Sequence, residues 1–141
     1  MRGEFMKVVV SAGGTGGHIY PALAILEKLK KEDKKLEVLY IGTKNRMESE
    51  IIPARGIDYV GLEIYGFSKN ILRDIKNVFL VSKSYHKCLK LLRDFNPDIV
   101  LGFGGYVTYP VLKAAKKLNI KTFLHEQNSI VGKTNRFLSK D

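Results

Sequence analysis

The chain contains one cysteine and lacks both a long apolar run and a secretion signal, and each absence argues against a class of protein. Because Cys88 is the only thiol, no disulfide can form within the chain, as suits a reducing cytoplasm. No stretch approaches the roughly 18 consecutive apolar residues that span a bilayer. The first residues also lack the apolar core of a signal peptide. We therefore expect a cytoplasmic protein that is not integral to a membrane.

Length and composition predict one globular domain. The chain has 141 residues, 45% of them apolar and 27% charged, which suffices to bury one core and is too apolar for a disordered chain. Residues 1–5 precede a second methionine, Met6, where a strand pattern begins, and they fit a native extension or an added tag. We assign the domain to residues 6–141.

The charge is strongly unbalanced toward basic residues. Lysine and arginine number 24 against 14 acidic residues, which gives a net charge of +10. A surface of this charge is expected to meet a polyanion. Nucleic acid, an anionic lipid surface and a phosphorylated substrate all fit it.

Apolar, β-rich runs alternate with longer segments of helical period, which is typical of βαβ units on a parallel sheet. We expect strands at residues 7–12, 36–41, 59–64, 98–103 and 121–125. Helices are expected at about 19–29, 47–54, 71–95 and 110–118, and a last one begins near residue 131. Runs such as VVV and IVL indicate strands that are covered on both faces. The predicted fold class is α/β, a Rossmann-like doubly wound parallel sheet with helices on both faces.

Four glycines stand between the first strand and the first helix, in the segment 11–18 (SAGGTGGH). Glycine lets the backbone take positive φ and approach a ligand, and the helix start offers free N–H groups. A tight turn needs only one or two glycines, so four favour an anion site. A dinucleotide fingerprint does not fit, because Ile19 replaces its third glycine and the second strand ends in Gly42-Thr43 without an acid. The G-K-[ST] of a P-loop is also absent.

The fourth and fifth strands end in two further unusual loops, 102–110 (GFGGYVTYP) and 125–128 (HEQN). Because the carboxyl ends of parallel strands share one edge, the two glycine turns predict a diphosphate held between two helix N-termini. Caps and turn hydrogen bonds explain Asn128 and Gln127, and they explain Glu126 less well. The histidines and carboxylates lack the spacing of a zinc site, and no G-x-S-x-G nucleophile motif is present.

Together these loops closely resemble the MurG family of N-acetylglucosaminyltransferases, in which they recur in this order. The matching segments are 13–24 (GGTGGHIYPALA), 102–110 and 125–128, and 43–53 (TKNRMESEIIP) is similar to a further family segment. The resemblance covers nearly all of residues 6–141. It implies the N-terminal, acceptor-binding half of a GT-B glycosyltransferase that needs no metal or other cofactor. The donor-binding C-terminal domain would be absent, so the isolated chain is expected to be inactive.

The reaction implied by the resemblance moves N-acetylglucosamine from UDP-N-acetylglucosamine to the 4-hydroxyl of the N-acetylmuramoyl group of undecaprenyl-linked lipid I. It inverts the anomeric carbon and forms lipid II for peptidoglycan synthesis, at the cytoplasmic face of the bacterial plasma membrane. By position, the donor contacts would be Thr15, Gly16, Gly17 and Asn128. The contacts to the acceptor diphosphate would be Gly13, Gly14, Gly104, Gly105 and Tyr106.

Two side chains are candidates for catalysis. His18 could act as the general base toward the acceptor hydroxyl, because an imidazole titrates near working pH. A helix-capping or phosphate-binding role for it is equally plausible. Glu126 could orient the hydroxyl or share the base role, with a structural hydrogen bond as the alternative. Arg46 could meet a phosphate or simply be solvated.

The helix expected at 71–95 carries a second surface. Its predicted core stripe is Ile71, Ile75, Val78, Ser82, Tyr85, Leu89 and Leu92. Away from it project Leu72, Phe79 and Leu80, among basic residues that include Lys76 and Lys83. Apolar side chains on a basic face suit the surface of an anionic membrane, although an ordinary solvated face is the alternative. A lipid-linked acceptor favours the membrane.

Rival functions have weaker support. A nucleic-acid-binding module would explain the charge, but it lacks a recognition motif and gives the glycine loops no role. A nicotinamide-dependent oxidoreductase lacks the ribose-binding acid. Another GT-B sugar transferase is the nearer alternative, and no nucleic-acid partner is expected.

Overall fold

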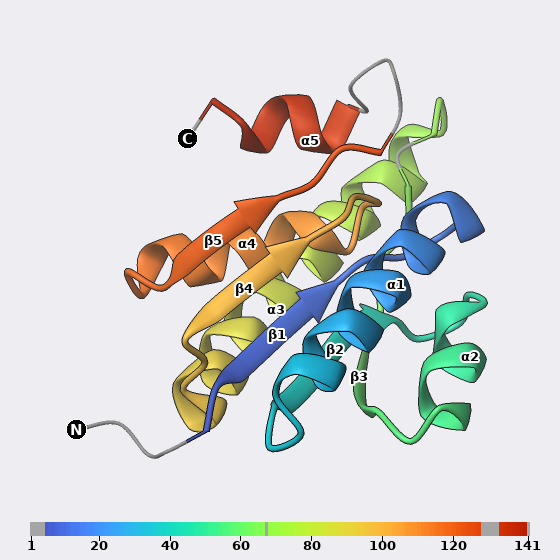
Figure 1. Ribbon diagram of the computed structural model, residues 1–141. Coiled ribbons are helices and arrows are strands. Elements are labelled where there is room, and N and C mark those ends of the chain that lie inside the picture. The colour runs from blue at the N-terminus through green and yellow to red at the C-terminus, as the bar shows by residue number, and fades with distance from the viewer. Residues whose placement is uncertain (1–4, 67, 128–132, 141) are drawn as a thin grey trace.

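The computed structural model describes residues 5–66, 68–127 and 133–140. Five parallel strands form one sheet in the order β3-β2-β1-β4-β5, and helices flank it on both sides (Figure 1). The strands are β1 (Lys7–Ser11), β2 (Glu37–Thr43), β3 (Asp58–Leu62), β4 (Ile99–Gly102) and β5 (Lys121–Leu124). The helices are α1 (Gly16–Glu32), α2 (Glu48–Ala54), α3 (Ile71–Phe95), α4 (Thr108–Lys117) and α5 (Lys133–Leu138). The predicted α/β fold is thereby confirmed.

The central strand sends its side chains alternately into two cores. Val8 and Val10 pack with residues of α1 and α2 on one face, and Val9 packs with residues of α3 and α4 on the other. All three are 0% exposed. Because both faces of β1 are covered, its uninterrupted apolar run is the pattern of a buried parallel strand.

Two helices begin earlier than the apolar period indicates. α1 begins at Gly16, ahead of Ile19, and α4 begins at Thr108, ahead of Pro110. Glycine and threonine carry no periodic apolar signal, so the sequence pattern places both starts too late. Both helix N-termini therefore adjoin the glycine turns.

The predicted core stripe of α3 is wrong in its first half. Ile71, Ile75 and Val78 are 75%, 51% and 56% exposed, and Ser82 is exposed as well. In the second half, Tyr85, Leu89 and Leu92 do pack in the core. The exposed apolar surface at the start of α3 is therefore larger than the sequence predicts.

A buried asparagine explains the shift of the stripe. The buried residues of α3 are Asn77, Ser84, Cys88 and Leu92. The Asn77 side chain bonds both backbone groups of Tyr65, whose N–H donates to Oδ1 at 2.9 Å. These bonds satisfy the Asn77 side-chain amide in the core. Asn77 therefore faces the core, where the apolar pattern predicts its apolar neighbours. Cys88 is 0% exposed in the same core, and burial raises the pKa of its thiol to about 12.

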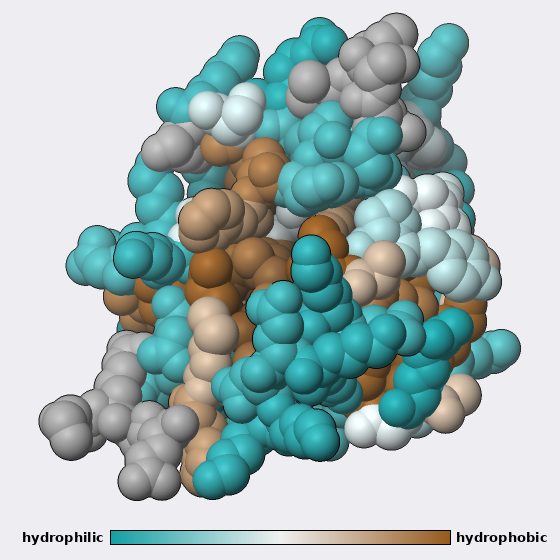
Figure 2. Space-filling model, viewed as in Figure 1, coloured by the Kyte–Doolittle hydropathy of each residue, from teal (hydrophilic) through white to brown (hydrophobic). Residues whose placement is uncertain are grey.

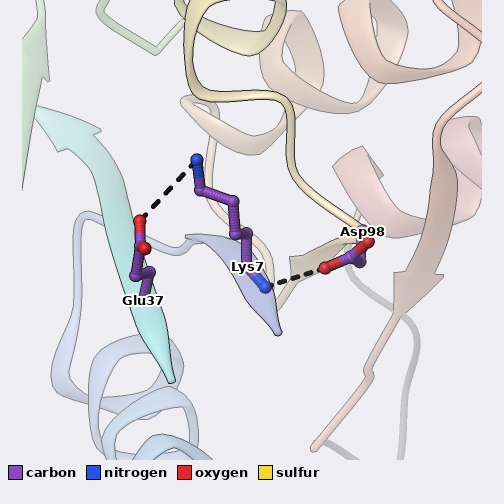
Figure 3. Close-up of polar contacts among 3 residues, drawn as sticks. All are labelled: Lys7, Glu37 and Asp98. Carbon is purple, nitrogen blue, oxygen red and sulfur yellow. Dashed lines mark hydrogen bonds and ion pairs between the residues drawn. The ribbon is translucent and has the colours of Figure 1, made fainter. Parts of the chain in front are cut away.

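Polar contacts join the strands at their amino-terminal ends, opposite the glycine turns (Figure 3). The Lys7 backbone N–H donates to Asp98 Oδ2 at 2.9 Å, and the Lys7 ammonium lies 3.7 Å from Glu37 Oε2. These residues stand at or next to the starts of β1, β4 and β2, so the contacts join three adjacent strands. The partly exposed ion pair itself adds little stability.

An apolar groove of about 340 Å³ lies on the α1 face of the sheet, over β4 and β5. Its walls include Ile25 and Leu29 of α1 with Leu101 of β4. Phe123 of β5 also lines it and is 59% exposed. Figure 2 shows apolar surface in the middle of this view, beside α1. Helices thus flank both faces of the sheet, while the α1 face of β5 is open among the described residues.

Candidate functional site

The two glycine turns lie side by side at the carboxyl edge of the sheet. β1 and β4 are parallel neighbours in which Ser11 pairs with Gly102, so both turns leave the same edge (Figure 1). The Gly13 N–H donates to the Gly104 carbonyl at 3.3 Å. The predicted convergence of the turns is confirmed.

Glycine is required where the turns touch. Gly105 has a φ of +93°, and an added Cβ would lie 2.4 Å from the Gly13 carbonyl oxygen. Gly104 has a φ of +110°, and its carbonyl accepts a second hydrogen bond, at 2.9 Å, from the buried Thr108 hydroxyl. The turns are therefore fixed to each other backbone against backbone.

The backbone N–H groups of the first turn divide into engaged and open ones. Gly13 N–H donates to Gly104 and Gly14 N–H donates to Glu48 Oε2, which corrects the expectation that these two amides face a diphosphate. Gly16 and Gly17 open α1, so their N–H groups have no carbonyl partner within the helix. The open donors of this turn thus belong to the predicted donor-binding residues.

His18 stands at the start of α1 with its ring between the two turns. Its Nδ1 lies 3.0 Å from the Gly13 carbonyl oxygen and 3.3 Å from Thr15 Oγ1. The other side of the ring faces Gly104, where an added Cβ would lie 3.1 Å from Nε2. A carbonyl only accepts, so the shorter contact places a proton on Nδ1 and leaves the Nε2 lone pair as the base.

Glu48 is 0% exposed behind the first turn. Its Oε1 accepts from the Thr43 N–H at 3.0 Å and from the Thr43 hydroxyl at 2.6 Å, and its Oε2 accepts from Gly14 N–H at 3.3 Å. A glycine at position 13 makes room for it, because an added Cβ would lie 2.4 Å from Oε1. These bonds stabilise a carboxylate that burial alone would destabilise.

Two tyrosines border this carboxylate. The Tyr40 hydroxyl donates to the Ala12 carbonyl at 2.9 Å, and the Tyr59 hydroxyl donates to the Thr43 carbonyl. Burial, and next the charge of Glu48, raise the pKa of both phenols above the ordinary value. Both groups are therefore held neutral in the folded protein.

We expect Tyr40 and Tyr59 to ionise only as the protein unfolds in alkali. Because folding raises their pKa above the unfolded value of about 10, the stability they contribute is complete below about pH 10 and is lost progressively as the pH rises from there toward the pKa of the folded protein. Tyrosinate absorbance and far-UV circular dichroism should show a last absorbance step that coincides with loss of helix. Tyr59→Phe should reduce that step. A last step that is complete while the helices persist would contradict the expectation.

The residue that holds the third loop approaches Gly104 from the same side as His18, because an added Cβ there would lie 3.5 Å from Asn135 Nδ2. The buried Asn135 of α5 donates from Nδ2 to the His125 carbonyl at 3.2 Å and to Glu126 Oε2 at 3.1 Å. Glu126 lines a hollow between α4, β5 and α5, whereas His18 lines another. The structure thus gives Glu126 the structural bond that the sequence left as an alternative. Asn128 lies outside the described residues.

A hollow of about 350 Å³ opens beside His18 at the carboxyl ends of β1, β2 and β3. Both glycine turns line it, together with the ionisable side chains Lys44, Arg46, Glu63, Tyr65, Arg73 and Tyr106. Arg46 also donates from Nη2 to the Gly14 carbonyl at 3.1 Å, so it supports the turn. Three cations against one carboxylate suit an anionic substrate. Within the described residues, no group of three His, Cys, Asp or Glu side chains could hold a metal ion.

The predicted membrane-contact residues lie along the first half of α3. Leu72 and Phe79 are 80% and 74% exposed, and Lys76 and Lys83 are exposed beside them. Leu80 is half-buried, which corrects its predicted projection. No helix in the described ranges is long and apolar enough to cross a membrane.

Sequence reasoning assigned no role to Glu48, Thr108 or Asn135. Each is a buried polar residue bonded to a loop of the site. Glu48 stands within the segment 43–53, which the family resemblance singles out, so that segment was the available signal. Thr108 likewise stands within the matching segment 102–110 and bonds Gly104 of the same segment. Asn135 lies outside the matching segments, so it carries no such signal.

Comparison with known sequences gives close relatives over almost the whole chain. Residues 8–141 match the family model described as the glycosyltransferase family 28 N-terminal domain. A UDP-N-acetylglucosamine--N-acetylmuramyl-(pentapeptide) pyrophosphoryl-undecaprenol N-acetylglucosamine transferase of Levilactobacillus brevis is 49% identical over 96% of this chain and 37% of its own length. The protein of the same name from Halalkalibacterium halodurans is 51% identical over 96% of this chain and 38% of its own length. The chain thus spans less than two fifths of these relatives.

Comparison with solved structures also gives a similar protein over almost the whole chain. The crystal structure of MurG from Acinetobacter baumannii matches with a TM-score of 0.83 and 31% identity, over 96% of this chain and 39% of that one. A UDP-GlcNAc 2-epimerase from Methanocaldococcus jannaschii matches with a TM-score of 0.64 and 18% identity, over 95% of this chain and 36% of that one. The second likeness shows the fold alone.

Proposed function

This chain belongs to the glycosyltransferase family 28 N-terminal domain family, and on that premise we propose that it is the acceptor-binding part of an inverting N-acetylglucosaminyltransferase. The full-length enzyme would transfer N-acetylglucosamine from UDP-N-acetylglucosamine to the N-acetylmuramoyl group of lipid I and form lipid II. The relatives at 49% and 51% identity are named for this reaction. The other domain, which makes most of the uridine contacts, would come from the part of the relatives that this chain does not span.

The observation that carries the proposal is the junction of the two glycine turns with His18 between them. Gly13 N–H bonds the Gly104 carbonyl at 3.3 Å, and the Nε2 side of His18 faces Gly104. A diphosphate bound at Gly104, Gly105 and Tyr106 would bring the sugar it carries toward that nitrogen. The first turn adds open N–H groups at a helix start for the donor phosphates.

In the proposed reaction, His18 Nε2 takes the proton of the acceptor 4-hydroxyl. The oxygen of that hydroxyl forms a bond to the anomeric carbon of the donor. The bond from that carbon to the UDP phosphate oxygen breaks, and UDP leaves with the electron pair. Thr15, Gly16, Gly17 and Asn128 would hold the donor. Glu126 would keep the third loop in place through Asn135 and leave the proton transfer to His18.

Ligand titration of this chain tests the assignment. A soluble lipid I analogue should bind and should shift the amide NMR signals of the glycine turns, and UDP-N-acetylglucosamine should bind weakly or not at all. NAD and an oligonucleotide serve as comparison ligands. Tight, salt-sensitive binding of the oligonucleotide alone would reject the transferase proposal.

We further propose that the start of α3 contacts the anionic cytoplasmic face of the plasma membrane. Five exposed apolar side chains gather there: Ile71, Leu72, Ile75, Val78 and Phe79. They are interspersed with exposed cations, namely Lys69, Arg73, Lys76 and Lys83. Each cation near an anionic surface contributes roughly 1 kcal/mol, and the apolar side chains can insert. A membrane-bound acceptor would be met at this surface.

Phe79→Ser is expected to weaken binding to anionic vesicles on the order of tenfold, because it removes a large inserting side chain. Co-sedimentation with vesicles of anionic and of neutral lipid measures this. Phe123→Ser is the matched control, since Phe123 is also exposed, at 59%, but lies on β5. Equal binding to both lipids, or an equal loss in the control, would refute the membrane surface.

A further inference from the structure

One peptide group links the buried Glu48 carboxylate to the His18 ring. The bond between Gly13 and Gly14 presents its N–H to Glu48 Oε2 at 3.3 Å and its carbonyl oxygen to His18 Nδ1 at 3.0 Å. The peptide is planar, so a contact that orients one end also orients the other. Because Glu48 is 0% exposed, its charge acts on this peptide with little screening by water.

We propose that Glu48 is a positioning residue that sets the tautomer of His18 through the Gly13–Gly14 peptide. Its hydrogen bond to the N–H polarises the peptide and makes the Gly13 carbonyl a stronger acceptor. That acceptor holds the ring proton on Nδ1, so Nε2 keeps its lone pair. In many enzymes a carboxylate orients a histidine base by direct contact, and here one peptide group stands between them. The catalytic use of this link rests on the proposed function, whereas the tautomer does not.

His18 Nδ1 has a second hydrogen-bond partner, which allows either tautomer of the ring. Thr15 Oγ1 lies 3.3 Å from the same Nδ1, and a hydroxyl can donate as well as accept. With the proton on Nε2, the Thr15 hydroxyl would donate to Nδ1 and the Gly13 carbonyl would face a lone pair. The strength of the Gly13 carbonyl as an acceptor therefore decides between the states.

Other charged and titratable groups also surround the ring. Those that share its hollow are Lys44, Arg46, Glu63, Tyr65, Arg73 and Tyr106. Near Gly104, Glu126 bonds Asn135, and the ring of His125 lies against Phe103 with 5.4 Å between centroids. Among the described residues, Glu48 supplies the carboxylate that hydrogen-bonds the peptide whose carbonyl contacts Nδ1.

Glu48→Gln tests the link in this chain without substrate. The amide oxygen can replace Oε1 and keep both Thr43 bonds, and the amide nitrogen then meets the Gly14 N–H, donor against donor. Nitrogen NMR of neutral imidazole rings reports the tautomer, with His86 and His125 as internal references. We expect a proton mainly on Nδ1 in the parent and mainly on Nε2 in Glu48→Gln. Glu50→Gln removes the same charge from an exposed position of α2 and should keep the parent tautomer.

A parent ring protonated on Nε2, or a Glu48→Gln ring that keeps its proton on Nδ1, would overturn the inference. If Glu48→Gln does not fold, the parent spectrum and Thr43→Val decide. Thr43→Val removes the 2.6 Å hydroxyl bond to Oε1 and leaves the Gly14 bond, so it should lower Tm without moving the proton. A moved proton in Thr43→Val would show that weakened packing alone shifts the tautomer, and would also overturn it.

In the full-length enzyme, Glu48→Gln should lower kcat about 10- to 100-fold, the range seen for groups that orient metal-bound histidines. The KM for the lipid acceptor should change little, because Glu48 lies behind the turn. A tautomer switch in a protein that proves to lack transferase activity would reject the proposed function and leave the link between Glu48 and His18 standing. Transferase activity in a full-length protein whose His18 tautomer does not change in Glu48→Gln would reject the link and leave the proposed function standing.

Discussion

His18→Ala is expected to lower kcat of the full-length transferase by about 10²- to 10⁴-fold, the usual contribution of a general base. The KM for the lipid acceptor should change little, because the ring would act on the hydroxyl in the transition state and contribute little to ground-state binding. The physical reason is the placement of Nε2 against Gly104, with Nδ1 engaged 3.0 Å from the Gly13 carbonyl. Steady-state kinetics with a soluble lipid I analogue measures both parameters.

His86→Ala is the matched control for this substitution. His86 is an exposed histidine of α3, so its loss should leave both kinetic constants at parent values. Comparable losses in kcat and in acceptor affinity for His18→Ala would remove the base role and favour the alternative, a side chain that binds phosphate. If both kcat and the KM for the acceptor stay unchanged, both roles would be excluded.

The parts of the fold that sequence could predict are those that produce a local pattern of apolar residues or glycines. The alternation of VVV-type runs with helical segments indicates the parallel sheet, and the glycines at 13–17 and 102–105 mark the turns of the site. The rule that carboxyl ends share an edge then brings these turns together. The neighbour relation of β1 and β4 in the structure confirms that step.

The parts that sequence missed depend on polar partners in other elements of the fold. Asn77 faces the core because it bonds the backbone of Tyr65, and this turned the apolar residues at the start of α3 outward against the expected stripe. Glu48 is buried because Thr43 and Gly14 supply donors to it. Apolar periodicity has no means to identify a polar side chain that is satisfied inside the protein.

The same distant contacts change how the first glycine turn is understood. Two of its N–H groups serve the protein, one holding the second turn and one holding Glu48. The turn is therefore formed before any ligand arrives, which reduces the ordering that binding would otherwise require. Its open N–H groups and the His18 ring are presented from a backbone that is already fixed.

Gly105→Ala should be the most destabilising small substitution at this junction, by about 2–6 kcal/mol. Left-handed backbone strain accounts for about 1–3 kcal/mol of this, and contact with a rigid backbone adds about 1–3 kcal/mol. The added Cβ would lie 2.4 Å from the Gly13 carbonyl oxygen, where φ is +93°. Because that oxygen also contacts His18 Nδ1, relief of the clash would displace the base.

Gly56→Ala separates the two contributions. Gly56 also has a positive φ, +73°, but nothing lies within 4 Å of its added Cβ, so only the strain of about 1–3 kcal/mol should appear. Urea unfolding of both variants, followed by circular dichroism, gives the difference directly. A larger loss in Gly105→Ala would locate the excess in the contact between the turns, since both positions have a positive φ and they differ in the space around the added Cβ. Equal losses would mean that the turns move apart freely, and the site would then lack the fixed junction on which the role of His18 depends.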